Sequence, residues 1–407
     1  MYNKQLNYAR EGKRRMKLLH ISDLHIGKRV NQFSMLEDQK YILRQIVVIA
    51  DEQQADGVMI AGDIYDKPVP SADAVQVFDW FLTELADHGK QVYAVSGNHD
   101  SAERIAFGAQ LMRGREVFVS PVYHGDTAKF TVKDSYGELC IYLLPFIKPA
   151  VVRHALEDTL DIKDKPMLES YHDAVKFAVE HMEVDSQKRN ILIAHQFVTG
   201  AGRCDSEEIS VGGLDNVDAE VFDVFDYVAL GHIHSPQHIK RETVRYCGTP
   251  LKYSFSEAEQ EKSVTVVGLG KKGDITLSMV PLVPLHDMRK IRGTYLEVTA
   301  KSFYQNMNTE DYVQITLTDE EDIPDGLQKL RIIYPNLMRL EYDNSRTQQN
   351  RVIDRSEEIE QKSELELFAE FYELQNNQKM SEEQTTFVAR LIEECNESNA
   401  GSGKGQA

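Results

Sequence analysis

The fold is decided by residues 16–27, which read MKLLHISDLHIG. The first six residues are mostly apolar and have the length of one buried strand. Asp23 and His25 follow this strand directly. Because sites in open α/β sheets form at the carboxyl ends of strands, the stretch predicts a strand that delivers a carboxylate and an imidazole to a functional site. The Asp-x-His spacing predicts that both side chains point to one side of an extended segment.

The same pattern recurs along residues 16–269, where short apolar runs alternate with helical patterns. Helices are expected at residues 36–50 and 74–85. Continuous apolar runs of strand length are typical of strands covered on both faces, so the pattern favours an α/β domain. The expected strands are residues 17–21, 57–61, 92–95, 140–144, 191–194, 227–230 and 263–269.

Five of these strands are followed by side chains that bind metal ions. The donors are Asp23, His25, Asp63, Asn98, His195, His232 and His234. One such residue is usually a cap or a solvated turn residue, but five strands with this feature are hard to produce by chance. The set is too large for one tetrahedral zinc, and imidazole with carboxylate suits manganese, iron or zinc. A carboxylate such as Asp63 can bridge two ions about 3.5–4 Å apart.

Length and composition restrict the class of protein. The 407 residues suggest two or three domains, and 42% hydrophobic residues are ordinary for a globular protein. No apolar run reaches the ~18 residues of a membrane span, so no membrane partner is expected. The net charge of −19 argues against a basic coat for nucleic acid but allows a local basic groove. Four scattered cysteines and the lack of a signal-peptide pattern predict a cytoplasmic protein.

The character of the sequence changes near residue 281. Residues 285–342 predict strands near 294–299, 312–317 and 338–342 and a helix near 325–334. Further on, Ser381 and Gln384 form a capping-box pattern at the start of a helix. The expected organisation is an N-terminal extension (1–15), a main α/β domain (16–280), a small β/α capping domain (281–342), a polar linker (343–363), a helical pair (364–395) and a disordered tail (396–407).

Five motifs follow one another along the chain. They are Asp23-x-His25, Gly62-Asp63, Gly97-Asn98-His99-Asp100, His195 and Gly231-His232-x-His234. In this order they resemble the calcineurin-like metallophosphoesterase superfamily, and residues 19–27, 61–66 and 96–101 are more closely similar to the nuclease subunits of bacterial SbcCD-type complexes. The resemblance runs from Met16 through the helical pair. It implies a layered α/β sandwich with a DNA-contacting capping domain.

The resemblance also implies roles for the site residues. Asp23, His25 and His234 would hold one divalent ion, with Mn²⁺ favoured, and Asn98, His195 and His232 a second, with Asp63 as the bridge. His99 would be the general acid that protonates the leaving ribose oxygen, a task that suits an imidazole. Asp66 stands where some relatives carry a second histidine. It either orients His99 or caps the next helix, and both interpretations stay open.

The activity implied is a metal-dependent DNA exonuclease and endonuclease that processes double-strand ends and hairpins in DNA repair. The alternatives are a phosphatase or phosphodiesterase for a smaller phosphoester, and an inactive scaffold. The small second domain and the helical pair favour the nuclease, and the complete donor set counts against the scaffold. Lys28, Arg29 and Arg104 are the candidates for DNA phosphate contacts, because they follow the ligand motifs.

The C-terminal segment predicts a protein partner rather than DNA. Residues 341–407 carry 15 acidic and 7 basic side chains. The resemblance implies that the helical pair grips the coiled coil of an SbcC-type ATPase subunit, and a homodimer stays open. No phosphate-binding Gly-x-x-x-x-Gly-Lys loop occurs, so no nucleotide is expected on this chain. The candidate partner-binding residues are Leu365, Phe368, Phe371, Tyr372, Phe387 and Leu391.

Overall fold

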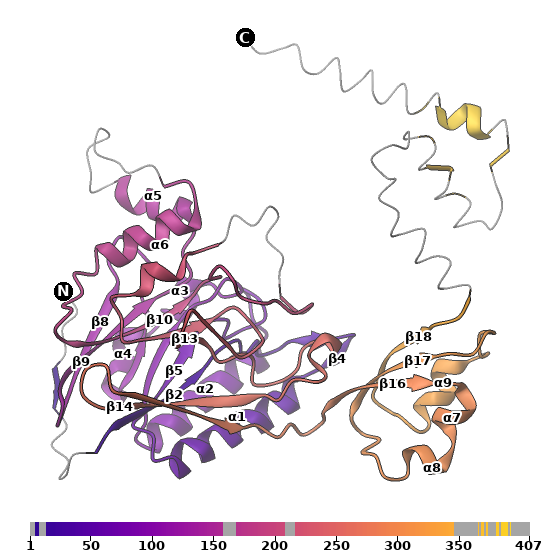
Figure 1. Cartoon of the computed structure of the whole chain (residues 1–407), viewed down its shortest axis with the longest axis horizontal. Helices are drawn as coiled ribbons and strands as arrows, with labels where there is room; N and C mark the ends of the chain where they lie inside the picture. Colours follow the sequence, from indigo (N-terminus) through magenta and orange to yellow (C-terminus); the bar gives the residue numbers. More distant parts are fainter. Residues whose placement is uncertain are drawn as a thin grey trace. The chain divides into compact units, whose positions relative to one another are not determined.

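The computed structural model describes residues 5–7, 14–157, 168–207 and 216–345, together with residues 365, 368, 369, 372, 380, 381, 384–389 and 391 (Figure 1). The chain divides into two compact units. One unit comprises Met1–Thr316 and Asp325–Glu341, and the other comprises Leu317–Pro324 and Tyr342–Ala407. The first unit carries every metal-donor residue that the sequence predicts.

Two mixed sheets form the centre of the first unit. The six-stranded sheet has the order β15 (Ile275–Pro281), β14 (Ser263–Leu269), β2 (Met16–Ile21), β5 (Gly57–Ala61), β6 (Gln91–Val95) and β7 (Val117–Val119). The seven-stranded sheet has the order β1 (Gln5–Asn7), β8 (Ala128–Asp134), β9 (Gly137–Leu144), β10 (Arg189–His195), β11 (Tyr227–Gly231), β13 (Arg241–Tyr246) and β12 (Gln237–Ile239). All seven predicted strands are thereby confirmed.

The two sheets share one apolar core. Tyr93 and Met59 of the six-stranded sheet pack in the same buried cluster as Phe130 and Ile191 of the seven-stranded sheet. A hydrogen bond also joins the two sheets within this layer, because His20 Nδ1 lies 2.9 Å from the Tyr227 hydroxyl. Burial lowers the pKa of His20 to about 3, so this imidazole is neutral and serves packing.

Helices cover the outer face of each sheet. Helices α1 (Leu36–Glu52) and α2 (Ala72–Asp87) share a buried cluster with β2, β5 and β6, which confirms both predicted helices. Helices α5 (Pro149–Glu157) and α6 (Tyr171–Glu180) share another with β9, β10 and β11. The result is the layered α/β sandwich that the family resemblance implies (Figure 1).

Residues 5–7 add a strand that the sequence does not signal. Within the predicted N-terminal extension, β1 pairs in parallel with β8, and Leu6 lies opposite Val132. A three-residue run of Gln, Leu and Asn has neither the length nor the alternation of a recognisable strand. Its pairing depends on the exposed edge of β8, which is a long-range property of the fold.

A three-stranded sheet follows the sandwich, in the order β16 (Met288–Gly293), β17 (Tyr312–Leu317) and β18 (Leu337–Tyr342). The helices around it are α7 (Tyr295–Thr299), α8 (Lys301–Tyr304) and α9 (Gly326–Arg331). The prediction of a strand at 294–299 is wrong, because Thr294 and Glu297 form a capping box that starts α7. This local bonding outweighs the β-branched composition of the segment.

Part of the C-terminal region is also described. Residues 384–389 are helical, and both capping-box bonds between Ser381 and Gln384 are present, at 2.9 and 3.2 Å, which confirms that helix start. Gln384 also donates to the Tyr372 hydroxyl at 3.1 Å. Phe371, most of the predicted linker and the tail 396–407 lie outside the described residues. Among the described residues, no helix has the length and apolar character to cross a membrane.

Candidate metal centre

The loops that follow β2, β5, β6, β10 and β11 meet where these strands end. Register explains the meeting: Ala61 pairs with Val95 at the end of β5 and β6, and His195 pairs with Gly231 at the end of β10 and β11. The two sheets approach so closely here that a Cβ on Gly231 would lie 1.8 Å from the Ala61 carbonyl oxygen. Glycine is therefore required directly before His232 for a steric reason.

Four of the predicted ligand residues adopt strained backbone conformations at this edge. Asp23, His25, Asp63 and His232 have φ angles of 52°, 44°, 47° and 98°. The prediction of an extended Asp23-x-His25 segment is therefore wrong. The two turns interlock instead, because the Asp23 N–H donates to the Gly62 carbonyl at 3.0 Å and the His25 N–H donates to the Asp63 carbonyl at 2.9 Å. Non-glycine residues in this region typically mark functional sites.

The first donor group comprises Asp23, His25 and His234. Their ligand atoms all lie within 4.8 Å of one another, and all three residues are buried. His25 Nε2 lies 3.2 Å from His234 Nε2. The Asp23 carboxylate accepts the His232 N–H at 3.0 and 3.2 Å, which fixes its direction. The structure thus brings together the three residues that the family resemblance assigns to the first ion.

The second donor group comprises Asn98, His195 and His232. Asn98 Oδ1 lies 2.9 Å from His195 Nε2 and 2.9 Å from His232 Nδ1. His195 donates through Nδ1 to the Ala61 carbonyl at 2.8 Å, so Nε2 carries the lone pair when the ring is neutral. That Nε2 faces two acceptor oxygens, Asn98 Oδ1 and, at 3.4 Å, Asp63 Oδ2. A cation between such atoms removes the repulsion of their lone pairs, so the donor set fits a metal ion.

Asp63 lies between the two groups. Its Oδ2 is 3.7 Å from His25 Nε2 and 3.4 Å from His195 Nε2. Its Oδ1 accepts the His99 N–H at 2.9 Å. A carboxylate with one oxygen near both donor groups has the position of a bridge between two ions.

The pKa values of the site show how strongly its charges are coupled. Burial alone would raise the pKa of Asp63, but the imidazoles of His195 and His25 bring it below its usual range. Burial alone would lower the pKa of His195, but Asp63 raises it to about 9. Burial and the nearby His195 lower the pKa of His232 to about 3. Without a cation, one proton on His195 therefore supplies positive charge that the carboxylates require.

His99 stands beside the donors with its orientation fixed. Its Nδ1 donates to the backbone carbonyl of Asp66 at 3.0 Å, and its Nε2 lies 3.9 Å from Asp63 Oδ2. Asp66 thus orients His99 through its peptide, while its side chain accepts from Lys28 at 2.7 Å. The helix-cap interpretation of Asp66 is wrong, because the N-cap of α2 is Ser71.

Comparison with known proteins agrees with this geometry. Residues 16–236 match the family described as calcineurin-like phosphoesterase, and residues 284–376 match the type 5 capsule protein repressor C-terminal domain, SbcD_C. The SbcD subunit of the nuclease SbcCD from Staphylococcus epidermidis is 31% identical over an alignment of 388 residues, and the match covers 93% of this chain and 98% of the relative. The chain belongs to the SbcD family of calcineurin-like phosphoesterases.

Two solved structures are also similar. A dimetal phosphatase from Danio rerio covers 66% of this chain and 96% of its own, at 12% identity and a TM-score of 0.42. A protein from Thermus thermophilus covers 65% and 99%, at 13% identity and a TM-score of 0.35. Family membership and the donor cluster identify this SbcD-family chain as a metal-dependent phosphoester hydrolase that binds divalent cations.

Several residues that support the SbcD-family site are not singled out by the sequence. The buried Asp100 carboxylate accepts the N–H groups of Ile64, Tyr65 and Gly97 at 2.9–3.0 Å and so joins the two loops around Asp63. Burial and the nearby Asp63 raise the pKa of Asp100 to about 6. The feature of the sequence that could have indicated this role is the position of Asp100 in the Gly-Asn-His-Asp motif.

Gln39 is another unpredicted support. It lies on the buried face of α1, donates to the His25 carbonyl at 2.7 Å and accepts the Gly27 N–H at 2.9 Å. The Tyr253 hydroxyl donates to the neighbouring Leu24 carbonyl at 2.6 Å. The sequence could have indicated Gln39, because it places an amide on the apolar face of a predicted helix. No local feature of the sequence indicated a role for Tyr253.

The three candidate DNA contacts differ in their surroundings. Lys28 is bound to Asp66, and its side chain is only 15% exposed. Arg29 is exposed and donates to the Gln32 carbonyl. Arg104 is exposed near the end of α3 (Ala102–Ile105), directly after the loop that carries Asn98 and His99. Arg29 and Arg104 are thus the more accessible cations of the three.

Proposed function

We propose that this chain is the nuclease subunit of an SbcCD-type complex and hydrolyses DNA phosphodiester bonds as an exonuclease and endonuclease. The observation that carries the proposal is the pair of donor groups joined by Asp63. Similarity to a nuclease subunit over 93% of the chain supports it. A smaller phosphoester as substrate is less favoured, because the family match continues to residue 376, beyond the phosphoesterase domain. DNA as substrate makes the cytoplasm the proposed site of action.

The proposed ligands of one ion are Asp23, His25 and His234, those of the other are Asn98, His195 and His232, and Asp63 joins them. Mn²⁺ is the proposed metal, because nitrogen, carboxylate and amide donors without thiolate suit it. Divalent cations held there supply Lewis-acid stabilisation of phosphate charge and lower the pKa of water. The chain's own contribution is to hold these seven side chains in hydrogen-bonded positions before substrate arrives, with all but Asn98 buried.

His99 is the proposed general acid. The bond from Nδ1 to the Asp66 carbonyl fixes the ring and leaves Nε2 for proton transfer. The side chain is 17% exposed, so substrate can reach it. In this role, Nε2 gives its proton to the oxygen that leaves phosphorus. Arg29 and Arg104 are the proposed contacts for flanking phosphates, and Lys28 instead acts through Asp66 on the loop of the site.

Two partners are proposed besides DNA. The C-terminal helical residues Phe368, Phe387 and Leu391 are 41%, 53% and 42% exposed, which suits docking of an SbcC-type ATPase. A homodimer is supported by Phe107 and Leu111, which are 84% and 85% exposed near α4 (Ala109–Met112). Sedimentation of the chain and of Leu111→Asp tests the dimer, which should dissociate in the variant and persist in Glu103→Ala.

The test of the proposed function is cleavage of end-labelled duplex DNA by the purified chain with Mn²⁺, with and without the partner ATPase. Expected results are metal-dependent cleavage, abolished by EDTA, and an ATP requirement only when the partner is present. Hydrolysis of a small phosphoester with no cleavage of any DNA would favour the phosphatase alternative.

A further inference from the structure

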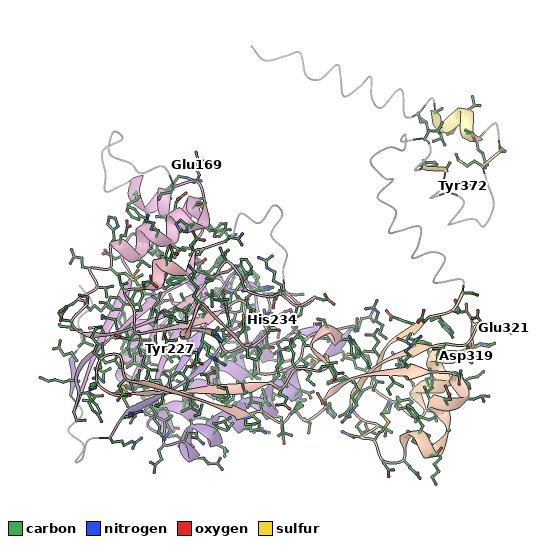
Figure 2. The ribbon with its side chains drawn as sticks, in the orientation of Figure 1. Glu169, Tyr227, His234, Asp319, Glu321 and Tyr372 are labelled. Carbon is green, nitrogen blue, oxygen red and sulfur yellow. The ribbon has the colours of Figure 1, made fainter. Side chains whose placement is uncertain are left out.

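The metal-donor residue His234 is held on its outer side by a row of polar side chains. His234 Nδ1 lies 2.6 Å from Ser206 Oγ, and the same hydroxyl donates to Glu257 Oε1 at 2.6 Å. The Lys262 ammonium donates to the other oxygen of Glu257, also at 2.6 Å. The side chains of Glu257 and Lys262 are 0% and 4% exposed, so water does not screen this ion pair. Figure 2 labels His234.

The direction of each bond follows from what each group can donate. Glu257 is the anionic partner of a buried ion pair, because the Lys262 ammonium donates to its Oε2 at 2.6 Å, so the carboxylate only accepts. Ser206 has one hydroxyl hydrogen, and it goes to Glu257. The hydrogen in the bond between Ser206 and His234 must then come from Nδ1 of the imidazole.

This assignment determines the other side of the ring. A neutral imidazole with its hydrogen on Nδ1 carries a lone pair on Nε2, and only a lone pair can bind a cation. His234 Nε2 is the atom that faces His25 in the first donor group. Metal-binding histidines generally donate their second N–H to a partner that fixes tautomer and orientation.

The peptide of His234 is held as well as its ring. Its N–H donates to Glu207 Oε1 at 2.7 Å, and its carbonyl accepts from Lys262 at 3.0 Å. Lys262 directly precedes β14 in the six-stranded sheet, whereas His234 follows β11 in the seven-stranded sheet. The network therefore joins the two sheets at the metal centre.

We propose that Ser206 and the Glu257–Lys262 ion pair are positioning residues that hold His234 in the tautomer presenting Nε2 to the first cation. The inference rests on the proposed function, because it requires a divalent cation in the first donor group. This role explains why the Glu257–Lys262 ion pair is buried. A buried carboxylate without a cationic partner would take up a proton, and it could then donate to the serine hydroxyl as well as accept from it, which would leave the tautomer of His234 undetermined.

Ser206→Ala removes the hydroxyl and leaves the ion pair in place. Mn²⁺ titration of the full chain, followed by electron paramagnetic resonance without DNA, should show affinity for one of two ions reduced by about 10–100-fold. The second ion should bind as in the wild type. Ser206→Thr keeps the hydroxyl and should restore the affinity.

The matched control is Ser254→Ala. Ser254 also donates to Glu257 Oε1, at 3.3 Å, and its bonds in this network do not include His234. It should bind both ions normally. Wild-type affinity in Ser206→Ala, or an equal loss in Ser254→Ala, would overturn the positioning role alone. A wild-type chain that binds no pair of Mn²⁺ ions would refute the proposed function, and with it the cation that this inference requires.

Discussion

The metal centre and the C-terminal helical residues use their side chains in opposite ways. Asp23 and His195 are fully buried, and each is held by a hydrogen bond to the backbone of a distant segment, Asp23 to His232 and His195 to Ala61 of β5. Phe387 and Phe368 are about half exposed, at 53% and 41%. The contrast separates two tasks. The chain organises its own chemical site, whereas a large exposed apolar surface is typical of a region that binds another protein.

The largest effect is expected from Asp63→Ala, which removes the carboxylate between the donor groups and tests whether the two regions act separately. Nuclease activity should fall by at least about 10⁴-fold, because the stabilisation that bound cations provide is worth several kcal/mol. Cleavage of labelled duplex with limiting Mn²⁺ measures the effect. Co-purification with the ATPase should be unchanged, and Asp274→Ala is a carboxylate control outside the site. Wild-type turnover in Asp63→Ala would contradict the two-metal assignment.

His99→Ala separates chemistry from metal binding within the centre. Turnover should fall by about 10²–10⁴-fold, the usual contribution of a general acid. Mass spectrometry of metal content should still find two ions per chain. Loss of one metal ion per chain in this variant would make His99 a ligand. This outcome is worth testing, because His99 also forms a donor cluster with His25 and Asp63.

The C-terminal side of the comparison is tested by the double variant Phe368→Asp and Phe387→Asp. Association with the partner ATPase should weaken by at least about 100-fold, since an unpaired carboxylate in a dry contact is costly. Truncation after Asp343 should weaken the association equally. The truncated chain should remain soluble and should keep its metal ions. Thr386→Asp adds the same charge beside Phe387 and should change little. Undiminished pull-down by the truncated chain would refute the docking role.

The smallest effect concerns pH. In the metal-free chain the pKa of His195 is raised to about 9, because Asp63 outweighs burial. The folded state therefore keeps a proton that the unfolded state releases near pH 6.5, and this stabilisation is complete below pH 6.5 and lost through pH 9. The free energy of unfolding in EDTA should fall by roughly 3 kcal/mol at most over this range. Urea unfolding measures it, and saturating Mn²⁺ under argon should remove the slope. A rise with pH would contradict the assignment.

Much of the centre could be predicted because strand ends and ligand types are local. The strands at 57–61 and 92–95 and the residues after them are visible in the sequence. The support from Tyr253 and Lys262 could not be predicted, because each contacts a loop far away in the chain. The strand predicted at 294–299 failed for the reverse reason, since a local capping box decides that segment.

The left-handed conformations of four proposed ligand residues have a consequence for the lifetime of the protein in a cell. Such residues cost on the order of 1–3 kcal/mol each, and a bound ion adds stability by mass action. We expect a chain deprived of ions to open more often and to be degraded faster. Metal supply would then control how many copies of the enzyme survive as well as how fast each one works. Pulse-chase of the wild-type chain in metal-depleted cells should show a shortened half-life.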